Sequence, residues 1–327
     1  MPEEQETKPE NLQQNAPATM IPANSVSDIQ QNEQRTKFKP VVFALVSLLI
    51  IFFLYQVIAG GITVFLFGAI PASNQTFVFR AAMMLAEFLF ILLPTLFLAK
   101  LQVKEWKQLL RVRKTDLFYI LLAVVGVISL QQLLEIYLYV QGLIPLPPQM
   151  KQIIEQFQKA IEETYKILIT ANSPSEFLFV VLVVAVTPAI CEETLFRGLV
   201  QGNFEIRMSK RAAIVLTGII FGLYHLDPFT LVPLCVLGIY LSYLVSVTGS
   251  IIAPVAAHFT NNFVSTLVYY GFGKDSMVAP SDDAKLGLGY ILGWSIAFAI
   301  IFIVTMKLTI EYSRRLSKIP AQEIKQP

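Results

Sequence analysis

Histidine and cysteine are scarce in this sequence, with two of each among 327 residues. Both cysteines, Cys191 and Cys235, fall inside apolar runs, where we expect a small hydrophobe rather than a disulfide or a metal ligand. Charge is also scarce, since only 15% of the residues are charged while 55% are hydrophobic and the mean hydropathy is +0.60. This balance excludes an ordinary soluble protein and indicates an all-α, polytopic membrane protein.

The first 36 residues lack aromatic residues and glycine and are rich in Gln, Asn, Glu and Pro. Such a segment buries too little apolar surface to offset the entropy of ordering, so residues 1–38 are predicted to be a disordered cytoplasmic tail. The tail is too long and too polar to begin a cleaved signal peptide, so the first apolar segment is expected to remain as an anchor. A transmembrane domain over 39–312 and a basic cytoplasmic tail over 313–327 complete the predicted organisation.

Apolar segments follow one another from Lys39 onward, and a window of about 20 residues finds about eight of them. They lie near 41–69, 80–99, 117–141, 175–200, 212–226, 229–247, 250–271 and 287–309. The fold class predicted from this series is a bundle of about eight transmembrane helices.

Lysine and arginine gather at four places that set the orientation of the chain. They precede the first segment, fill the connection between the second and third, separate the fourth from the fifth, and follow the eighth. The residues are Arg35, Lys37, Lys39, Lys100, Lys104, Lys107, Arg111, Arg113, Lys114, Arg207, Lys210, Arg211, Arg314, Arg315 and Lys318. With eight spans all four clusters fall on one side, which the positive-inside rule assigns to the cytoplasm. We therefore expect a multi-pass protein of the cell membrane with both termini cytoplasmic and the lipid bilayer as a partner.

One outer connection shows helical periodicity. From Pro148 to Ile169, apolar side chains recur at three- and four-residue spacing while charged side chains occupy the other face. The pattern predicts an amphipathic helix lying on the membrane surface. Its acidic pair, Glu162 and Glu163, has no arginine four residues later, and we interpret it as part of the charged face.

The fourth segment has a readable start and a predicted kink. Ser173-Pro174-Ser175-Glu176 matches a capping box with proline at the first helical position. Pro188 removes the backbone hydrogen bond to Val184 and should kink the helix just ahead of the acids that follow. Such a kink opens backbone groups and space for water.

Two adjacent carboxylates, Glu192 and Glu193, lie near the end of this run together with Arg197. An ionised group inside a bilayer is costly unless it is paired or faces water. On a helix Glu193 and Arg197 share a face four residues apart, and Glu192 points about 100° away. One carboxylate is therefore predicted to be structural and the other available for chemistry. A solvated charge cluster at a helix end is the alternative interpretation.

The only two histidines, His225 and His258, both fall in predicted membrane segments. A single intramembrane histidine is typical of a satisfied core residue, whereas two of them beside a glutamate pair at similar depth favour a functional site. On a helix His258 and Asn262 share a face.

Three motifs in this order resemble those of the CPBP (Abi) family, which includes the CAAX endopeptidases and bacterial relatives tied to bacteriocin processing and immunity. They are Glu192-Glu193-x-x-x-Arg197, Phe221-x-x-x-His225 and His258-x-x-x-Asn262. The resemblance covers 175–271 and implies an eight-helix, CAAX-protease-like intramembrane endopeptidase. It also implies the roles: Glu192 with His225 activates water, His258 and Asn262 stabilise the oxyanion, and Glu193 and Arg197 shape the site.

The sequence is compatible with catalysis both with and without a divalent metal. Glu192, His225 and His258 would supply the two-histidine, one-carboxylate set of a catalytic zinc site. The family is traditionally named a metalloprotease family, and a metal-free glutamate mechanism is also proposed for it. We favour the metal-free form, because the Glu193–Arg197 pair and Asn262 then have clear uses.

Two other functions are alternatives to an endopeptidase. A transporter or channel would use intramembrane polar residues to line a proton or cation path, and the candidates are Glu87, Gln131, Glu135, Glu192 and Glu193. The same fold without turnover would suit an immunity or scaffold protein. No His-Glu-x-x-His zinc helix is present, and Gly271-Phe272-Gly273-Lys274-Asp275 only approximates an aspartyl-protease signature. The expected substrates are CAAX-type proteins or, for a bacterial source, small membrane peptides, leaders or pheromones. No nucleic-acid partner is expected.

Overall fold

The computed structural model describes residues 36–68, 70–145, 147–272 and 288–316, and within these ranges the regular structure is helical throughout. All eight predicted apolar segments are helices, so the all-α assignment is confirmed. The predicted N-terminal tail lies almost entirely outside the described residues, as does most of the predicted basic tail after Arg315.

The first half of the chain forms three long helical rods, two of which change to π-helical geometry along their length. Their parts are α2 (Pro40–Phe52), η1 (Phe53–Ala59) and α3 (Gly60–Phe67); the 3₁₀ turn η2 (Ser73–Gln75); α4 (Thr76–Glu87), η3 (Phe88–Leu92) and α5 (Leu93–Gln102); the short α6 (Trp106–Leu109); and α7 (Leu117–Gly142). The predicted amphipathic helix is α8 (Pro148–Ile169), with the predicted bounds.

The second half carries the motifs. Its first five parts form one continuous rod, the motif-bearing rod: α9 (Pro174–Val181), η4 (Leu182–Val186), α10 (Thr187–Glu193), η5 (Thr194–Val200) and α11 (Gln201–Arg207). Four further helices follow: α12 (Lys210–Tyr224), α13 (Leu231–Thr248), α14 (Ile252–Phe272) and α15 (Leu288–Leu316). The N-cap of α9 is as predicted, because the Ser173 hydroxyl accepts from the Glu176 N–H at 3.2 Å. The Glu176 carboxylate turns instead to the N–H of Asn172, at 2.8 Å.

Six of these helical rods are long and apolar enough to cross a membrane: Pro40–Phe67, Thr76–Gln102, Leu117–Gly142, Pro174–Arg207, Leu231–Thr248 and Gly289–Leu316. The prediction of about eight differs for α12 and α14. With 15 residues, α12 is only about 22 Å long, less than the hydrocarbon thickness of about 30 Å. The 21-residue α14 is long enough, but His258, Asn261 and Asn262 lower its hydropathy.

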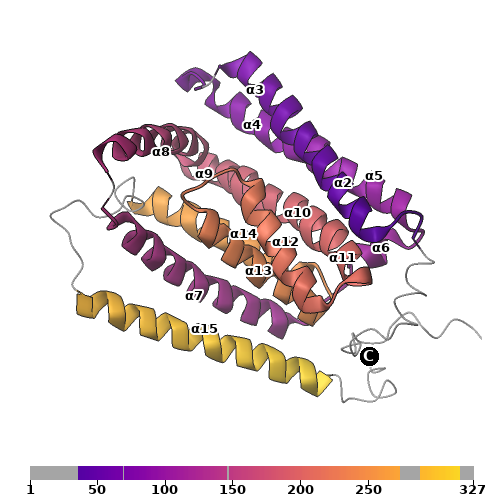
Figure 1. The fold of residues 1–327 in the computed structure, drawn as a ribbon. Helices are drawn as coiled ribbons and strands as arrows, with labels where there is room; N and C mark the ends of the chain where they lie inside the picture. The colour runs from indigo at the N-terminus through magenta and orange to yellow at the C-terminus, as the bar shows by residue number, and fades with distance from the viewer. Residues whose placement is uncertain (1–35, 69, 146, 273–287, 317–327) are drawn as a thin grey trace, which may run out of the picture.

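The four basic clusters meet at one end of the bundle. The N–H of Lys37 donates to the Gln102 carbonyl, and Arg111 forms an ion pair with Glu205 at 2.5 Å. At the same end the Tyr312 hydroxyl of α15 donates to Asp116, which caps α7, at 2.6 Å. In Figure 1, α6 and α11 mark this end and α8 lies at the other.

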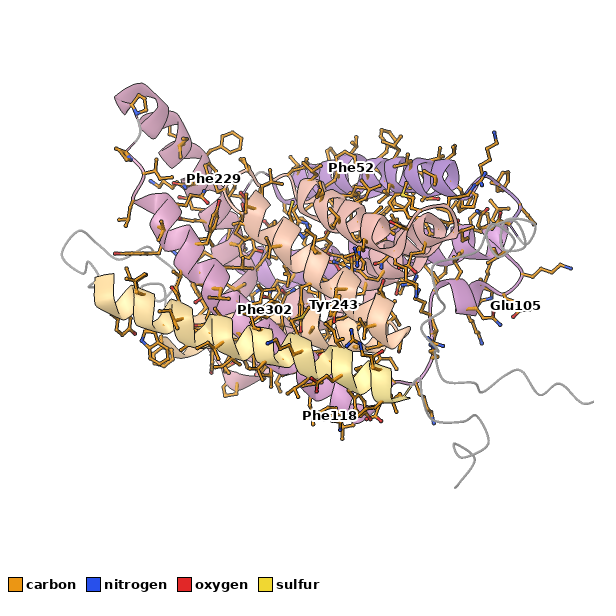
Figure 2. The ribbon with its side chains drawn as sticks, turned by 60° about the horizontal axis from the view of Figure 1, so that its bottom comes forward. Phe52, Glu105, Phe118, Phe229, Tyr243 and Phe302 are labelled. Atoms are coloured by element: carbon orange, nitrogen blue, oxygen red, sulfur yellow. The ribbon has the colours of Figure 1, made fainter. Side chains whose placement is uncertain are left out.

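Two layers of apolar side chains hold the bundle together. One layer joins α2, η3 and α12 to the motif-bearing rod through Ile51, Ile91, Phe221 and Leu195. The other joins α7, α13 and α14, and Phe302 of α15 packs against it beside Tyr243, at the seam visible in Figure 2. The motif-bearing rod therefore lies inside the bundle.

The crossing of α12 and α13 is unusually close because glycines face each other there. A Cβ built on Gly238 would lie 2.7 Å from the carbonyl oxygen of Gly218, and one built on Gly218 would lie 2.4 Å from the backbone nitrogen of Ile239. No side chain fits between these backbones. The carbonyl of Gly238 is thereby placed against the motif-bearing rod.

A methyl group at this crossing is expected to force the two helices apart. We predict that Gly238→Ala lowers the free energy of unfolding by about 1–3 kcal/mol, the usual cost of overpacking a closed interface. Gly61→Ala in α3 is the matched control, because its Cβ would meet nothing within 4 Å. Thermal unfolding of both variants in detergent checks this, and equal stability of the two would contradict it.

Candidate active site

A fully buried ion pair lies at the centre of the motif-bearing rod. Glu193 and Arg197 are completely inaccessible to solvent, and Oε1 of Glu193 accepts from Nη1 of Arg197 at 2.8 Å. The same oxygen contacts Nδ1 of His258 at 2.9 Å, and Nη2 of Arg197 donates to the Gly238 carbonyl at 3.0 Å. The predicted four-residue pair is therefore present, and it joins α10, η5, α13 and α14.

Phe221 packs its ring against both this ion pair and the other histidine, His225. Its buried ring lies 4.4 Å from the guanidinium carbon of Arg197, an attractive cation–π arrangement. The ring centroids of His225 and His258 lie 4.6 Å and 5.9 Å from it. Its backbone carbonyl contacts Nδ1 of His225 at 2.7 Å, which fixes that ring and leaves Nε2 for another partner.

Glu192 faces Nε2 of His225, as its predicted direction away from Arg197 requires. The distance between Oε2 of Glu192 and this nitrogen is 3.8 Å, too long for a direct hydrogen bond. The Glu192 side chain is 18% exposed and that of His225 30%, whereas Oε2 itself is buried without a hydrogen-bond partner. The pair is thus accessible from one side and closed on the other.

Asn262 is positioned by the predicted proline effect. Because Pro188 has no N–H, the carbonyl of Val184 loses its helical partner, and Nδ2 of Asn262 donates to that carbonyl at 3.0 Å. The π-helical segment η4 ends immediately before Thr187, where α10 begins with its proline. One hydrogen of the Asn262 amide is used in this contact, and the nitrogen carries a second.

Three nearby groups are not among the site residues predicted from the sequence. Two are backbone carbonyls, those of Gly238 and Val184, which any residue would supply. The third is Glu87 of α4, which interacts electrostatically with Glu192 across the contact between α4 and α10. Its Oε2 is buried without a hydrogen-bond partner, like that of Glu192. An acid inside an apolar run was the signal for Glu87.

The predicted zinc ligands are arranged differently from a metal site. In the part of the chain that the structure describes, no three His, Cys, Asp or Glu side chains converge in a metal-binding group. Nδ1 of His258 is held by Glu193 instead of turning with His225 toward Glu192. In this arrangement His258 does not join Glu192 and His225 as a third ligand, and the preference for a metal-free mechanism stays a prediction.

These features define an all-α polytopic membrane protein with an acid–histidine site enclosed among its helices. Residues 174–264 match a family model described as type II CAAX prenyl endopeptidase, Rce1-like, which confirms the resemblance to the CPBP family. The matched segment begins with α9 and contains all three motifs. The match supports an intramembrane CAAX endopeptidase function in general. No curated protein and no solved structure matches the chain significantly.

Removing one partner of the buried ion pair is expected to be costly. We predict that Arg197→Met lowers the free energy of unfolding by about 3–5 kcal/mol, because the Glu193 carboxylate would remain buried without its cation. The double variant Glu193→Gln/Arg197→Met removes both charges and should recover part of that loss. Unfolding of the three proteins in detergent measures this, and a double variant less stable than Arg197→Met would contradict it.

Proposed function

We propose that this protein is an intramembrane endopeptidase in which Glu192 is the general base. The observation that carries the proposal is the 3.8 Å separation between the Glu192 carboxylate and Nε2 of His225. Oε2 is closed to water in this arrangement, so a small movement of the Glu192 carboxylate is needed to admit one. A water molecule about 2.8 Å from both atoms would then span that separation at an angle of about 85° and be held by both groups at once. Partial exposure of both side chains gives that water a route in.

The chemistry follows from these positions. Glu192 takes a proton from the water as its oxygen attacks the peptide carbonyl, which becomes a tetrahedral oxyanion. The same proton then passes from Glu192 to the leaving amine as the C–N bond breaks, so the carboxylate is regenerated. His225, fixed through Phe221, orients the water for this attack.

Asn262 and His258 are the proposed oxyanion donors. The second amide hydrogen of Asn262 is free of the Val184 contact and supplies one hydrogen bond. His258 contacts Glu193 through Nδ1, so a hydrogen bond from this ring to the oxyanion is donated by Nε2 and requires a proton on that nitrogen. Donors fixed in advance in a site of low dielectric are the most effective means of stabilising an oxyanion.

The proposed substrates are peptide chains that reach this site from within or beside the bilayer. They are membrane-associated peptides or CAAX-type proteins, in line with the matched family. No step above uses a metal. A scaffold that binds such peptides without cutting them predicts that function survives loss of the Glu192 carboxylate. A transporter, in which Glu192 would line the ion path, predicts ion or proton flux in place of peptide cleavage.

Cleavage of fluorogenic peptides by purified protein in detergent tests the assignment of Glu192. The probes are a farnesylated CAAX peptide and an unprenylated hydrophobic peptide. We predict that Glu192→Ala lowers kcat by about 10²–10⁴-fold, the usual contribution of a general base, and that His258→Ala also loses activity. Glu105→Ala, an exposed acid far along the chain, should match the wild type. Undiminished cleavage by Glu192→Ala would refute the assignment.

Chelation separates the two mechanistic forms. With 1,10-phenanthroline, we predict that wild-type cleavage persists, because every proposed step is carried by side chains. Loss of cleavage that added zinc restores would instead establish a metalloprotease.

The orientation of the site is a further part of the proposal. Every residue from Glu193 to Phe204 is buried, so the rod is closed between the site and the basic end. The accessible groups lie on the other side of this closed stretch, because Glu192 precedes it along the rod and His225 follows α12, which begins at the basic end with Lys210. With the basic end in the cytoplasm, as in a multi-pass cell-membrane protein with cytoplasmic termini, the site opens toward the outer face, so this orientation favours membrane-associated peptides over cytoplasmic CAAX-type proteins as substrates.

Cysteine labelling in intact cells checks this orientation. We predict that a membrane-impermeant maleimide labels Leu143→Cys, at the α8 end, and leaves Glu105→Cys unlabelled until the membrane is permeabilised. Both positions are exposed, and wild-type labelling gives the background from Cys191 and Cys235. The reverse pattern would place the basic end outside.

A further inference from the structure

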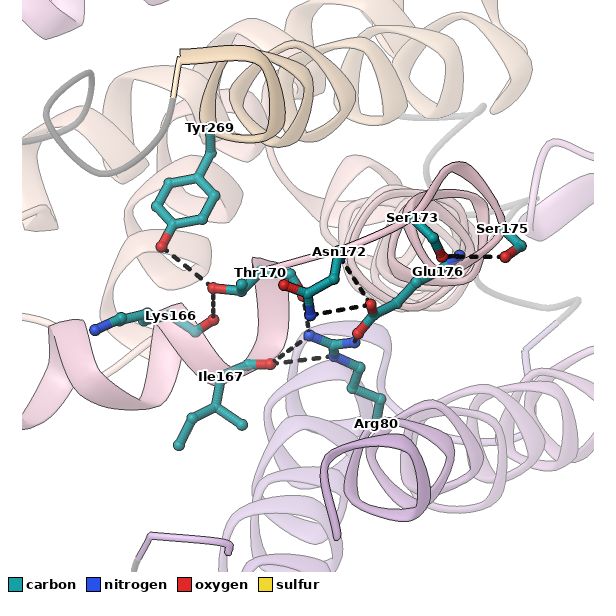
Figure 3. Close-up of polar contacts among 9 residues, drawn as sticks. All are labelled: Arg80, Lys166, Ile167, Thr170, Asn172, Ser173, Ser175, Glu176 and Tyr269. Carbon is teal, nitrogen blue, oxygen red and sulfur yellow. Dashed lines mark hydrogen bonds and ion pairs between the residues drawn. The ribbon is translucent and has the colours of Figure 1, made fainter. Parts of the chain in front are cut away.

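Arg80 of α4 clamps the C-terminal end of α8 to the bundle, as Figure 3 shows. Its side chain is 2% exposed and forms an ion pair with Glu176 at 2.7 Å. Its remaining donors reach the carbonyls of Ile167, at 2.7 and 3.1 Å, and of Thr170. These carbonyls belong to the last turn of α8 and the residue after it, where helical partners run out. One arginine thus joins α4, α8 and α9.

The apolar face of this last turn is also fixed. Leu168 and Ile169 pack in a small cluster with Val180, Val184 and Tyr269. The Tyr269 hydroxyl of α14 lies 3.2 Å from that of Thr170. Val184 is the residue whose carbonyl accepts from Asn262, so the end of α8 rests beside the candidate site.

Tyr165 lies on the face that this cluster uses. It precedes Leu168 and Ile169 by three and four residues, and such residues share one side of a helix. The cluster does not enclose it, since 61% of its surface is exposed. Its ring therefore projects past the packed turn on the side of α8 that faces the bundle.

The surroundings of the Tyr165 hydroxyl agree with this placement. Burial by nearby protein raises its pKa above the usual value, and the carboxylates of Glu192 and Asp227 raise it further. The exposed Tyr165 side chain therefore lies within electrostatic range of both carboxylates. A phenol with a raised pKa keeps its proton at neutral pH and remains a hydrogen-bond donor.

Asp227, the second of these carboxylates, already accepts hydrogen bonds from its own loop. Its carboxylate accepts from the N–H of Phe229 at 2.9 Å and from the Thr230 hydroxyl at 2.6 Å, which stabilises the loop after His225. The loop is therefore stabilised without a hydrogen bond from the Tyr165 hydroxyl. This hydroxyl lies within electrostatic range of both Asp227 and Glu192, and its donor is available.

We propose that Tyr165 is a substrate-positioning residue, whose hydroxyl donates to a backbone carbonyl of the peptide next to the bond that is cut. The peptide lies between α8 and the loop 226–230, with its apolar side chains against the aromatic ring. This proposal rests on the proposed endopeptidase function, because it assigns the peptide a path to Glu192. Tyr165 acts on binding and alignment, while Glu192 acts on the water.

Phe157 provides a matched control on the same helix. It lies eight residues before Tyr165, and 60% of its surface is exposed. Loss of its ring tests what the removal of any exposed aromatic residue from α8 does to the helix or to its contact with lipid.

Kinetics with the farnesylated CAAX peptide and the unprenylated hydrophobic peptide form the first arm of the test. We predict that Tyr165→Phe raises KM about 3–10-fold, the worth of one hydrogen bond, with kcat changed less. Tyr165→Ala should raise KM further, and Phe157→Ala should stay within about twofold of the wild type. Unchanged KM in Tyr165→Phe, or equal effects of the two alanine variants, would overturn the proposal.

The second arm needs no turnover and so separates this proposal from the proposed function. In a Glu192→Gln background, Tyr165→Cys and Phe157→Cys are labelled with a maleimide, with and without each uncleaved peptide. We predict that peptide slows labelling at position 165 at least threefold and leaves position 157 unchanged. Protection at 165 without wild-type cleavage would support the proposed position while refuting the protease. No protection at 165, or equal protection at both positions, would overturn it.

Discussion

The buried Glu193–Arg197 pair is the constraint on which the rest of the structure depends. Two charges placed in a low-dielectric interior must be neutralised within hydrogen-bond distance, and three further helices supply what is needed. The contact of α12 with α13 through Gly218 and Gly238 brings a carbonyl to Arg197. The ring of Phe221 packs against the guanidinium of Arg197, and Nδ1 of His258 contacts the Glu193 carboxylate. Each of these contacts also places a residue of the candidate site, so stability and site geometry are coupled.

The helical plan could be predicted from sequence because it follows from hydropathy, capping and proline. The start of α9 at Pro174, the bounds of α8, and the orphaned carbonyl of Val184 all follow from local rules. The partners of the site residues could not be predicted in this way. Spacing shows that His258 and Asn262 share a face, but it does not say that Glu193 rather than Glu192 binds His258. Backbone acceptors such as Gly238 leave no side-chain signature at all.

The amphipathic helix α8 shows a second limit of sequence patterns. Its periodicity identifies an apolar face, and a membrane surface and a protein opening satisfy that face equally well. The choice depends on long-range contacts, chiefly those of Arg80 with the carbonyls of Ile167 and Thr170. Arginine 80 lies 87 residues before the first of these acceptors, so no local rule connects them.

The short helix α12 has a consequence for the surrounding lipid. Val215, Ile219 and Leu223 form an exposed apolar stripe along it at four-residue spacing, and that stripe ends just before His225. Lipid chains beside α12 have only about 22 Å of apolar surface to cover, so the bilayer must thin there or draw its headgroups inward. Thinning beside α12 brings interfacial water closer to His225, whereas the bilayer keeps its full thickness beside the helices that span it. Acyl-chain length in the host membrane is thereby a physical variable that sets how wet this side of the protein is.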